Sequence, residues 1–258
     1  MDITLASRTL FTIGPIHITD SLLGAFVVSL ALMIVGIWVA RSFAIVPTRT
    51  QLALESIANY LLESLEGAFG SKVEARKFFG LTFTLLLYIA IANQFSLLPL
   101  IFEITYNGFD VLRQPTSDLG GTIALALIVV VLSNVLAMGI SPIQHLKNFF
   151  PIDKFFKVRS VADFFYACID MFVGVLNIVG EFAKVVSLAA RLFGNIFAGN
   201  VMAAVIASLV PFVLPLPFLA ISIFSGLVQA FVFMLLSMQF IAGSISGARP
   251  PVTITQEG

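Results

Sequence analysis

The segment SLAARLFGNIFAGN, residues 187–200, places a single arginine inside a long apolar run. After Arg191 the next charged residue is Arg249. A guanidinium stays protonated at any relevant pH, and a charge at membrane depth costs at least about 2.5–3.5 kcal/mol. Ionisable groups inside a membrane usually mark an ion pathway. The sequence therefore predicts that this arginine has a function.

The composition is that of a membrane protein. The 258 residues are 59% hydrophobic and 11% charged, whereas an ordinary soluble domain is about a quarter charged. The net charge is zero, so no basic excess points to nucleic acid. The single cysteine, Cys168, can form no internal disulfide, and the two histidines show no metal-ligand spacing. We expect an all-α polytopic membrane protein without a cofactor or a metal site.

The apolar runs divide the chain into about five membrane-embedded helices and one interfacial amphipathic helix. The first run is long enough to cross a hydrocarbon core of about 30 Å. We expect a single membrane domain over residues 1–258. Its segments are an outer N-terminal segment at 1–20, a first span at 21–43, the interfacial helix at 50–70, a second span at 77–98, a third span at 118–141, a long tilted helix at 161–209 and a last long helix at 212–247.

Lysines and arginines gather on one side of this topology. That side holds Arg41, Arg49, Lys72, Arg76, Lys77, Lys147, Lys154, Lys157, Arg159 and Arg249. The other side holds only Arg8 and Arg113. Because basic residues favour the cytoplasmic side, we expect the N-terminus outside and the C-terminus in the cytoplasm.

A polar line follows one face of the helix expected at 161–209. Its members recur every seven residues, a step that returns to nearly the same face, and are Asp170, Asn177, Lys184 and Arg191. One interpretation is that these groups pair internally, for example Lys184 with Glu181 or Asp170. The other, which we favour, is that Arg191 faces a titratable carboxylate on another subunit. At about 1.5 Å per residue the helix would be roughly 70 Å long, so it must tilt, kink or lie nearly flat against a partner.

The segment around Arg191 resembles the most characteristic segment of subunit a of F-type ATP synthases, with its S-L-x-x-R-L-F-G-N core. Further stretches resemble the same family in order, namely VPTRTQLALE, ANQFSLLP, PTSDLGGTIALAL and LVQAFVFMLL. The resemblance covers nearly the whole chain. It implies a proton-conducting stator subunit that performs no bond chemistry, in which two half-channels serve the carboxylates of a rotating ring of c subunits.

The resemblance also implies partners and a location. The partners are the ring of c subunits, b-type peripheral stalk subunits, the soluble ATP synthase head and the lipid bilayer, with no nucleic acid among them. The location is an energy-transducing membrane, which we expect to be a bacterial plasma membrane.

The family pattern assigns roles to particular positions. Arg191 matches the essential stator arginine, and Asn195 and Gln229 match polar channel residues beside it. Lys184 matches a lysine one helical stretch earlier. Glu181 is a candidate acid for the inner half-channel, although Asn177 falls nearer the place of the family's usual glutamate.

The outer half-channel departs from the pattern. Asn200 stands where the family often has a glutamate or a histidine, Ser222 where a histidine or glutamate sometimes sits, and Ser96 where some relatives carry an aspartate. Asp118 is the clearest remaining outer acid. We expect protons as the conducted ion. Na⁺ stays an alternative, because neutral oxygens also suit a hard cation. A self-contained secondary transporter is a further alternative, but such proteins usually show internal repeats, and we find no repeat of the Arg191 helix in the first half.

Several polar residues also have a purely structural interpretation. Ser222 either lines the channel or donates to a carbonyl of its own helix. Asp118 either caps the third span or serves the channel. Asn93 and Asn134 either join helices to one another, which we favour, or line the channel. His145 is expected at the membrane interface.

Overall fold

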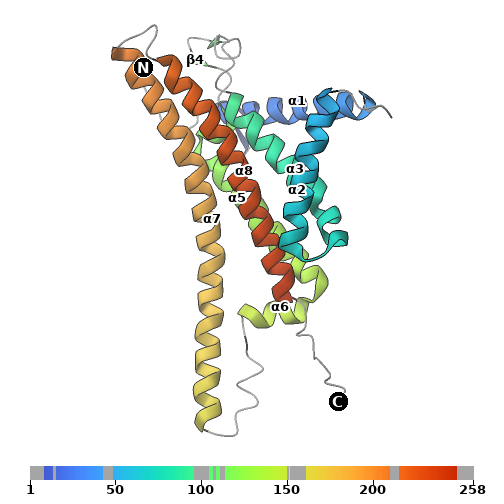
Figure 1. The fold of residues 1–258 in the computed structure, drawn as a ribbon. Helices are drawn as coiled ribbons and strands as arrows, with labels where there is room; N and C mark the ends of the chain where they lie inside the picture. The colour runs from blue at the N-terminus through green and yellow to red at the C-terminus, as the bar shows by residue number, and fades with distance from the viewer. Residues whose placement is uncertain are drawn as a thin grey trace. The chain divides into compact units, whose positions relative to one another are not determined.

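The computed structural model describes residues 9–13, 16–42, 49–95, 105–106, 109–110, 114–149, 151, 161–209 and 215–248 (Figure 1). Ser96 and residues 1–8 lie outside this part of the chain. The helices are α1 (Asp20–Ser42), α2 (Arg49–Phe69), α3 (Lys72–Gln94), η2 (Pro115–Ser117, a 3₁₀ turn), α5 (Leu119–Ile140), α6 (Pro142–Phe149), α7 (Val161–Leu209) and α8 (Pro215–Ala248). Two antiparallel hairpins are formed by β1 (Thr9–Ile13) with β2 (Ile16–Thr19) and by β3 (Thr105–Tyr106) with β4 (Phe109–Asp110).

Five of the described helices are long and apolar enough to cross a membrane. They are α1, α3, α5, α7 and α8. This confirms the predicted all-α polytopic fold class. The two short hairpins are additional elements beside these helices. Large apolar side chains such as Trp38, Phe182 and Phe224 are exposed on these helices. Such exposure is typical of a surface that faces lipid.

Helix α7 is continuous over 49 residues, so it is roughly 70 Å long at about 1.5 Å per residue. No proline interrupts it, because the prolines of this region come later, at 211, 215 and 217. Pro215 is the first residue of α8, a position where proline's missing N–H costs no helical hydrogen bond.

Helix α6 falls between the third span and the long helix expected at 161–209, where no helix was predicted. Pro142 is its first residue, and the His145 amide donates to the Ser141 carbonyl at 3.0 Å. Ile143 and Leu146 are exposed, whereas His145 is buried. The helix therefore presents two different faces.

The chain divides into two compact units. The first unit comprises residues 1–125 and 188–236, and the second comprises 126–187 and 237–258. Each of α5, α7 and α8 therefore contributes one part of its length to each unit. The single membrane domain over residues 1–258 stays a prediction.

In the first unit, α2 packs against α3. Leu61 and Leu65 of α2 and Ile89 of α3 are almost fully buried, and the Phe69 and Phe78 rings stack at 5.1 Å between centroids. Gly70 forms the turn between the two helices, with φ of 66° and its amide donating to the Glu66 carbonyl at 2.9 Å. Glycine suits this left-handed position because it has no Cβ.

Candidate functional site

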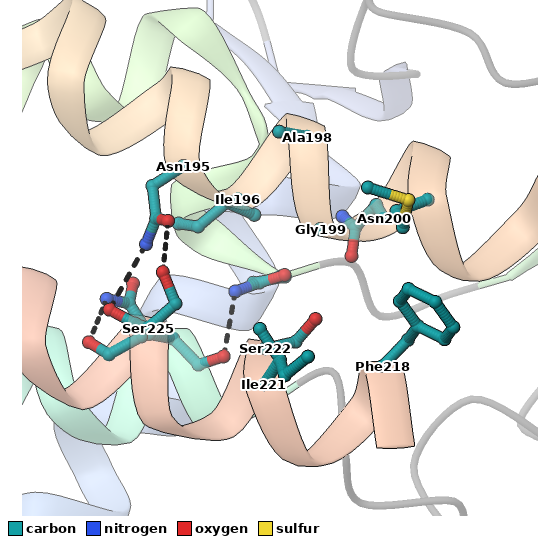
Figure 2. A pocket seen from close by; sticks show the side chains of 13 residues that line it. Asn195, Ile196, Ala198, Gly199, Asn200, Phe218, Ile221, Ser222 and Ser225 are labelled. Atoms are coloured by element: carbon teal, nitrogen blue, oxygen red, sulfur yellow. Dashed lines mark hydrogen bonds between the residues drawn. The ribbon is translucent and has the colours of Figure 1, made fainter. Parts of the chain in front are cut away.

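Each unit contains a polar cavity. The cavity of the first unit, here called the Asn200 cavity, has a volume of about 270 Å³ (Figure 2). Its polar lining residues are Asn93, Gln114, Asn195, Asn200, Ser222 and Ser225, and no described residue that lines it is charged. Since a water molecule takes up about 30 Å³ in the liquid, the cavity has room for several.

Asn195 of α7 and Ser225 of α8 bind one another at one side of this cavity, and Figure 2 shows them pointing toward each other. The Ser225 hydroxyl donates to Asn195 Oδ1 at 2.5 Å, and Asn195 Nδ2 donates to the Ser225 carbonyl at 3.3 Å. Nearby, a Cβ added to Gly199 would lie 3.3 Å from Ser222 Oγ. The two helices therefore approach closely while keeping polar groups at the cavity. Ser222 is among the residues that line it, and its role in a channel stays a prediction.

Asn93, near the end of α3, makes three buried hydrogen bonds beside the cavity. Its Nδ2 donates to the Gly226 carbonyl of α8 at 3.0 Å. Its Oδ1 accepts from the Thr116 hydroxyl at 3.1 Å, and its backbone carbonyl accepts from Gln114 Nε2 at 3.1 Å. The prediction that Asn93 joins helices is confirmed.

Two amides next to this network have unused atoms. Gln114 is 2% exposed, and its Oε1 is buried without a hydrogen-bond donor among the described residues. Gln229 Nε2 is likewise buried, with no acceptor in the part of the chain that the structure describes. Gln229 follows Ser225 by four residues, so the two side chains share a face of α8. Buried polar atoms rarely stay unpaired, and water in the Asn200 cavity can serve Gln114.

Asp118 is not among the described residues that line the Asn200 cavity. Its Oδ1 accepts from the Gly120 amide at 3.3 Å, directly before α5. That is the contact of an N-cap residue, whose side chain satisfies an amide of the first helical turn. The geometry supports the capping interpretation, and a role in ion transfer is untested.

The cavity of the second unit, here called the Glu181 cavity, also has a volume of about 270 Å³. Its lining comes from α6, α7 and α8, and its polar members are His145, Asn148, Asn177, Glu181, Lys184 and Ser244. Asn177 Nδ2 donates to the Asn148 carbonyl at 2.8 Å, and Asn148 Nδ2 donates to the Gly247 carbonyl at 3.0 Å. This cavity, unlike the first, is lined by ionisable groups.

Both oxygens of the Glu181 carboxylate have a donor. Lys184 Nζ lies 2.5 Å from Oε1, and Asn134 Nδ2 of α5 lies 3.0 Å from Oε2. The Glu181 and Lys184 side chains are 22% and 28% exposed. The internal pairing considered for Lys184 is therefore present, but it occurs at a cavity wall rather than in a sealed core. Asn134 joins two helices, as predicted.

The expected position of His145 at the membrane interface stays a prediction. The side chain is only 7% exposed and lines the Glu181 cavity, with Nε2 3.0 Å from Asn134 Oδ1. Its hydrogen-bond partner lies on the preceding long helix, α5, and the other residues of the cavity lining come from α6, α7 and α8. Burial lowers the pKa of His145 below its usual value, the Glu181 charge opposes this shift and the Lys184 charge adds to it.

Arg191 is exposed on the part of α7 that belongs to the first unit. Among the described residues, the ion pairs Lys72–Glu66 and Lys184–Glu181 do not include it. In the sequence of α7, Arg191 falls between the residues that line the Glu181 cavity and those that line the Asn200 cavity. Its exposure leaves the guanidinium accessible to a partner.

Long apolar helices with polar cavities between them define a multi-pass membrane protein. The family model described as ATP synthase A chain matches residues 22–242. The chain belongs to this family, which confirms the resemblance of the Arg191 segment and places the chain in the membrane sector of an F-type ATP synthase.

Individual relatives are similar along most of their length. The sodium ion specific ATP synthase subunit a of Propionigenium modestum is 32% identical over 90% of this chain and 75% of the relative. Subunit a 2 of a Bradyrhizobium species is 30% identical, covering 93% and 95% of the two chains. Subunit a of Moorella thermoacetica is 28% identical, covering 92% and 96%.

Proposed function

We propose that this chain translocates protons as the stator subunit a, with two half-channels that lead to and from the carboxylates of a c-ring. Arg191 is the essential charge and the barrier between the half-channels. The observation that carries this proposal is the pair of polar cavities, lined by separate stretches of α7 with Arg191 between them in sequence. The subunit forms no covalent bonds, and ATP is made in the soluble head, which is held by b-type stalk subunits.

The Glu181 cavity is the inner half-channel and the Asn200 cavity the outer one. The support is the distribution of charge in the sequence, which puts the basic stretch from Lys147 to Arg159 on the cytoplasmic side. Helix α6, which lines the Glu181 cavity, begins this stretch. In a bacterial plasma membrane the N-terminus then lies outside and the C-terminus in the cytoplasm.

The mechanism is electrostatic. A ring carboxylate that faces lipid is protonated, because burying its charge costs too much free energy. Beside Arg191 the same carboxylate ionises, because a nearby opposite charge favours the charged form. The proton leaves through one half-channel, the ring turns past Arg191, and a new proton enters through the other. Exposure of Arg191 on α7 supports this role.

Sodium is the second candidate ion. The described lining of the Asn200 cavity offers only uncharged oxygens and nitrogens, a set that also suits a hard cation. A relative at 32% identity is named as sodium ion specific. We favour protons because the Glu181 cavity contains three groups that can exchange them, His145, Glu181 and Lys184.

The test is a paired measurement on complete complexes in vesicles. Arg191→Ala should assemble, because α7 keeps its apolar packing, yet it should make no ATP while passive proton leak persists or rises. Arg191→Lys should also fail, because an ammonium lacks the planar fork and can lose its proton. Normal coupled synthesis in either variant contradicts the proposal. Sodium removal and a protonophore then identify the ion, since only a proton pathway is uncoupled by the protonophore at every sodium concentration.

A further inference from the structure

Asn134 connects two ionisable residues of the second unit that are distant in sequence. Its Nδ2 donates to Glu181 Oε2 at 3.0 Å and to the Val130 carbonyl of its own helix at 2.8 Å. Its Oδ1 lies 3.0 Å from His145 Nε2. The amide thus stands between the carboxylate of α7 and the imidazole of α6.

The acceptors around Asn134 determine which atoms donate. Both hydrogens of its amide nitrogen go to acceptors, so its oxygen faces His145. A turned amide would set that oxygen against a carboxylate and a carbonyl, which are both acceptors. An amide oxygen only accepts, so His145 Nε2 carries a proton in the neutral and in the charged imidazole. Titration of His145 therefore takes place at Nδ1 and leaves the hydrogen bond to Asn134 in place.

We propose, on the basis of the function proposed above, that His145 is a positioning residue of the inner half-channel. Its Nε2–H orients the Asn134 amide, and the oriented amide holds Glu181 Oε2 while Lys184 binds the other oxygen. Loss of the imidazole donor leaves the Asn134 oxygen unpaired in a partly buried site, where either orientation of the amide lacks a partner. Glu181 then loses one of the two contacts that fix its carboxylate at the cavity.

Titration of His145 adds a pH dependence to this role. The titratable groups that act on it are Glu181 and Lys184 of α7. From α5 it meets the uncharged Asn134, and from α8 the lining residues of the same cavity are Gly243, Ser244 and Gly247. On α6 the Phe149 ring packs edge-on at 5.1 Å, and the adjacent Lys147 is exposed.

The direction of the effect follows from these charges. Burial keeps the pKa of His145 below its usual value, so the imidazole is neutral near neutral pH and charges only in acid. The Lys184–Glu181 pair has no net charge, so an imidazolium makes the cavity positive. A positive cavity repels an entering proton. Proton uptake from the α6 side should therefore fall in acid more steeply than in a protein without this histidine.

Two substitutions separate the donor from the titrating group. His145→Phe keeps an aromatic ring and removes the donor, whereas His145→Gln keeps an N–H donor and does not titrate. The quantity to measure is ATP-driven proton uptake by complete complexes in vesicles. It is normalised to the amount of assembled complex and followed over a pH series on the α6 side. His145→Phe should lower uptake on the order of tenfold, the cost of an unmade buried hydrogen bond. His145→Gln should keep most of the neutral-pH rate and lose the acid-side fall.

Controls make the result specific. Ile143→Ala changes an exposed side chain on the same helix and should leave rate and pH profile unchanged. In a Glu181→Gln background, His145→Phe should have no further effect, because two residues that act through one another are not additive. If His145→Phe does not assemble, the pH profile of His145→Gln decides the matter.

The inference is overturned by a wild-type rate and profile in His145→Phe, by a wild-type acid-side fall in His145→Gln, or by additive losses in the double variant. These outcomes differ from failure of the proposed function. If Arg191→Ala stops synthesis while the His145 variants behave like wild type, only the positioning role is wrong. If Arg191→Ala keeps normal coupling, the proposed function itself is wrong.

Discussion

The two cavities have about the same volume and opposite chemistry. The described lining of the Asn200 cavity is uncharged, whereas the Glu181 cavity contains a histidine, a carboxylate and an ammonium. The first is held by amides and hydroxyls bound to helix carbonyls, as between Asn93 and Gly226, and the second by an ion pair and the amide beside it. What a neutral cavity can bind depends on its shape and its water. What a charged cavity can bind depends on which proton-exchanging groups are present.

The largest effect should come from removing the carboxylate. Glu181→Gln should lower proton flux on the order of 10²-fold, because it removes a positioned acid–base group. The measurement is flux in vesicles at equal amounts of assembled complex. Glu63→Gln, an exposed position on α2, is the matched control. Combining Glu181→Gln with Lys184→Gln should not restore flux, which excludes the unpaired lysine as the cause. Flux of Glu181→Gln close to wild type would remove Glu181 from the pathway.

The next largest effect should come from a steric change at the Asn200 cavity. A Cβ added to Gly226 would lie 3.3 Å from Asn93 Cβ and 3.2 Å from Gln94 Nε2. Gly226→Ala should therefore destabilise the packing of α3 on α8 by about 1–3 kcal/mol. Thermal unfolding of the complex measures the loss. Gly36→Ala, where nothing lies within 4 Å of the added Cβ, should have little effect. Equal stability of the two variants would show that the contact yields easily.

A new charge in the Asn200 cavity should be tolerated. Asn200 is exposed at the cavity, and the family that this chain resembles often has an acid at that position. Asn200→Glu should therefore keep ATP synthesis within about threefold, a difference of less than 1 kcal/mol. ATP synthesis in vesicles is the measurement. Loss of coupling in an assembled complex would instead favour sodium as the conducted ion.

The smallest functional change should come from cysteines that report sidedness. After Cys168→Ser, which removes the exposed native thiol, Asn200→Cys and Asn177→Cys should keep flux until they are labelled. A membrane-impermeant thiol reagent should react with Asn200→Cys from outside and with Asn177→Cys from inside. Labelling of both from one side would contradict the assignment of the two cavities to opposite half-channels.

The sequence predicted the residues that lie on one helix. Arg191, Lys184 and Asn195 are related by helical spacing, and α7 is indeed continuous through all of them. The spans followed from hydropathy alone, because uncharged runs of this length have few alternatives in a membrane. The pairing of Lys184 with Glu181 was also open to prediction, since residues three apart on a helix are neighbours.

Contacts between helices escaped prediction. Asn93 reaches Gly226 across 133 residues of sequence, and Asn134 reaches Glu181 across 47. No periodicity relates such positions, because the approach of two helices is set by packing. The neighbours that bury His145 escaped prediction for the same reason. The alternation of exposed Ile143 and Leu146 with His145 contained a signal for a short two-faced helix, but nothing in it indicated which neighbour would cover the histidine.

The joint between α3 and α8 has a mechanical meaning. A stator must hold still while a rotor turns beside it, so force on any of its helices has to be carried into the rest of the subunit. Asn93 donates to the Gly226 carbonyl at 3.0 Å, and Gln94 donates to the Ile223 carbonyl at 2.9 Å. Because Gly226 has no side chain, the two helices are in close contact there. Hydrogen bonds weaken steeply once they are stretched or misaligned, so short bonds across a tight contact form a stiff coupling. Stiffness at this point would let the force of each ring step turn the rotor rather than bend the stator.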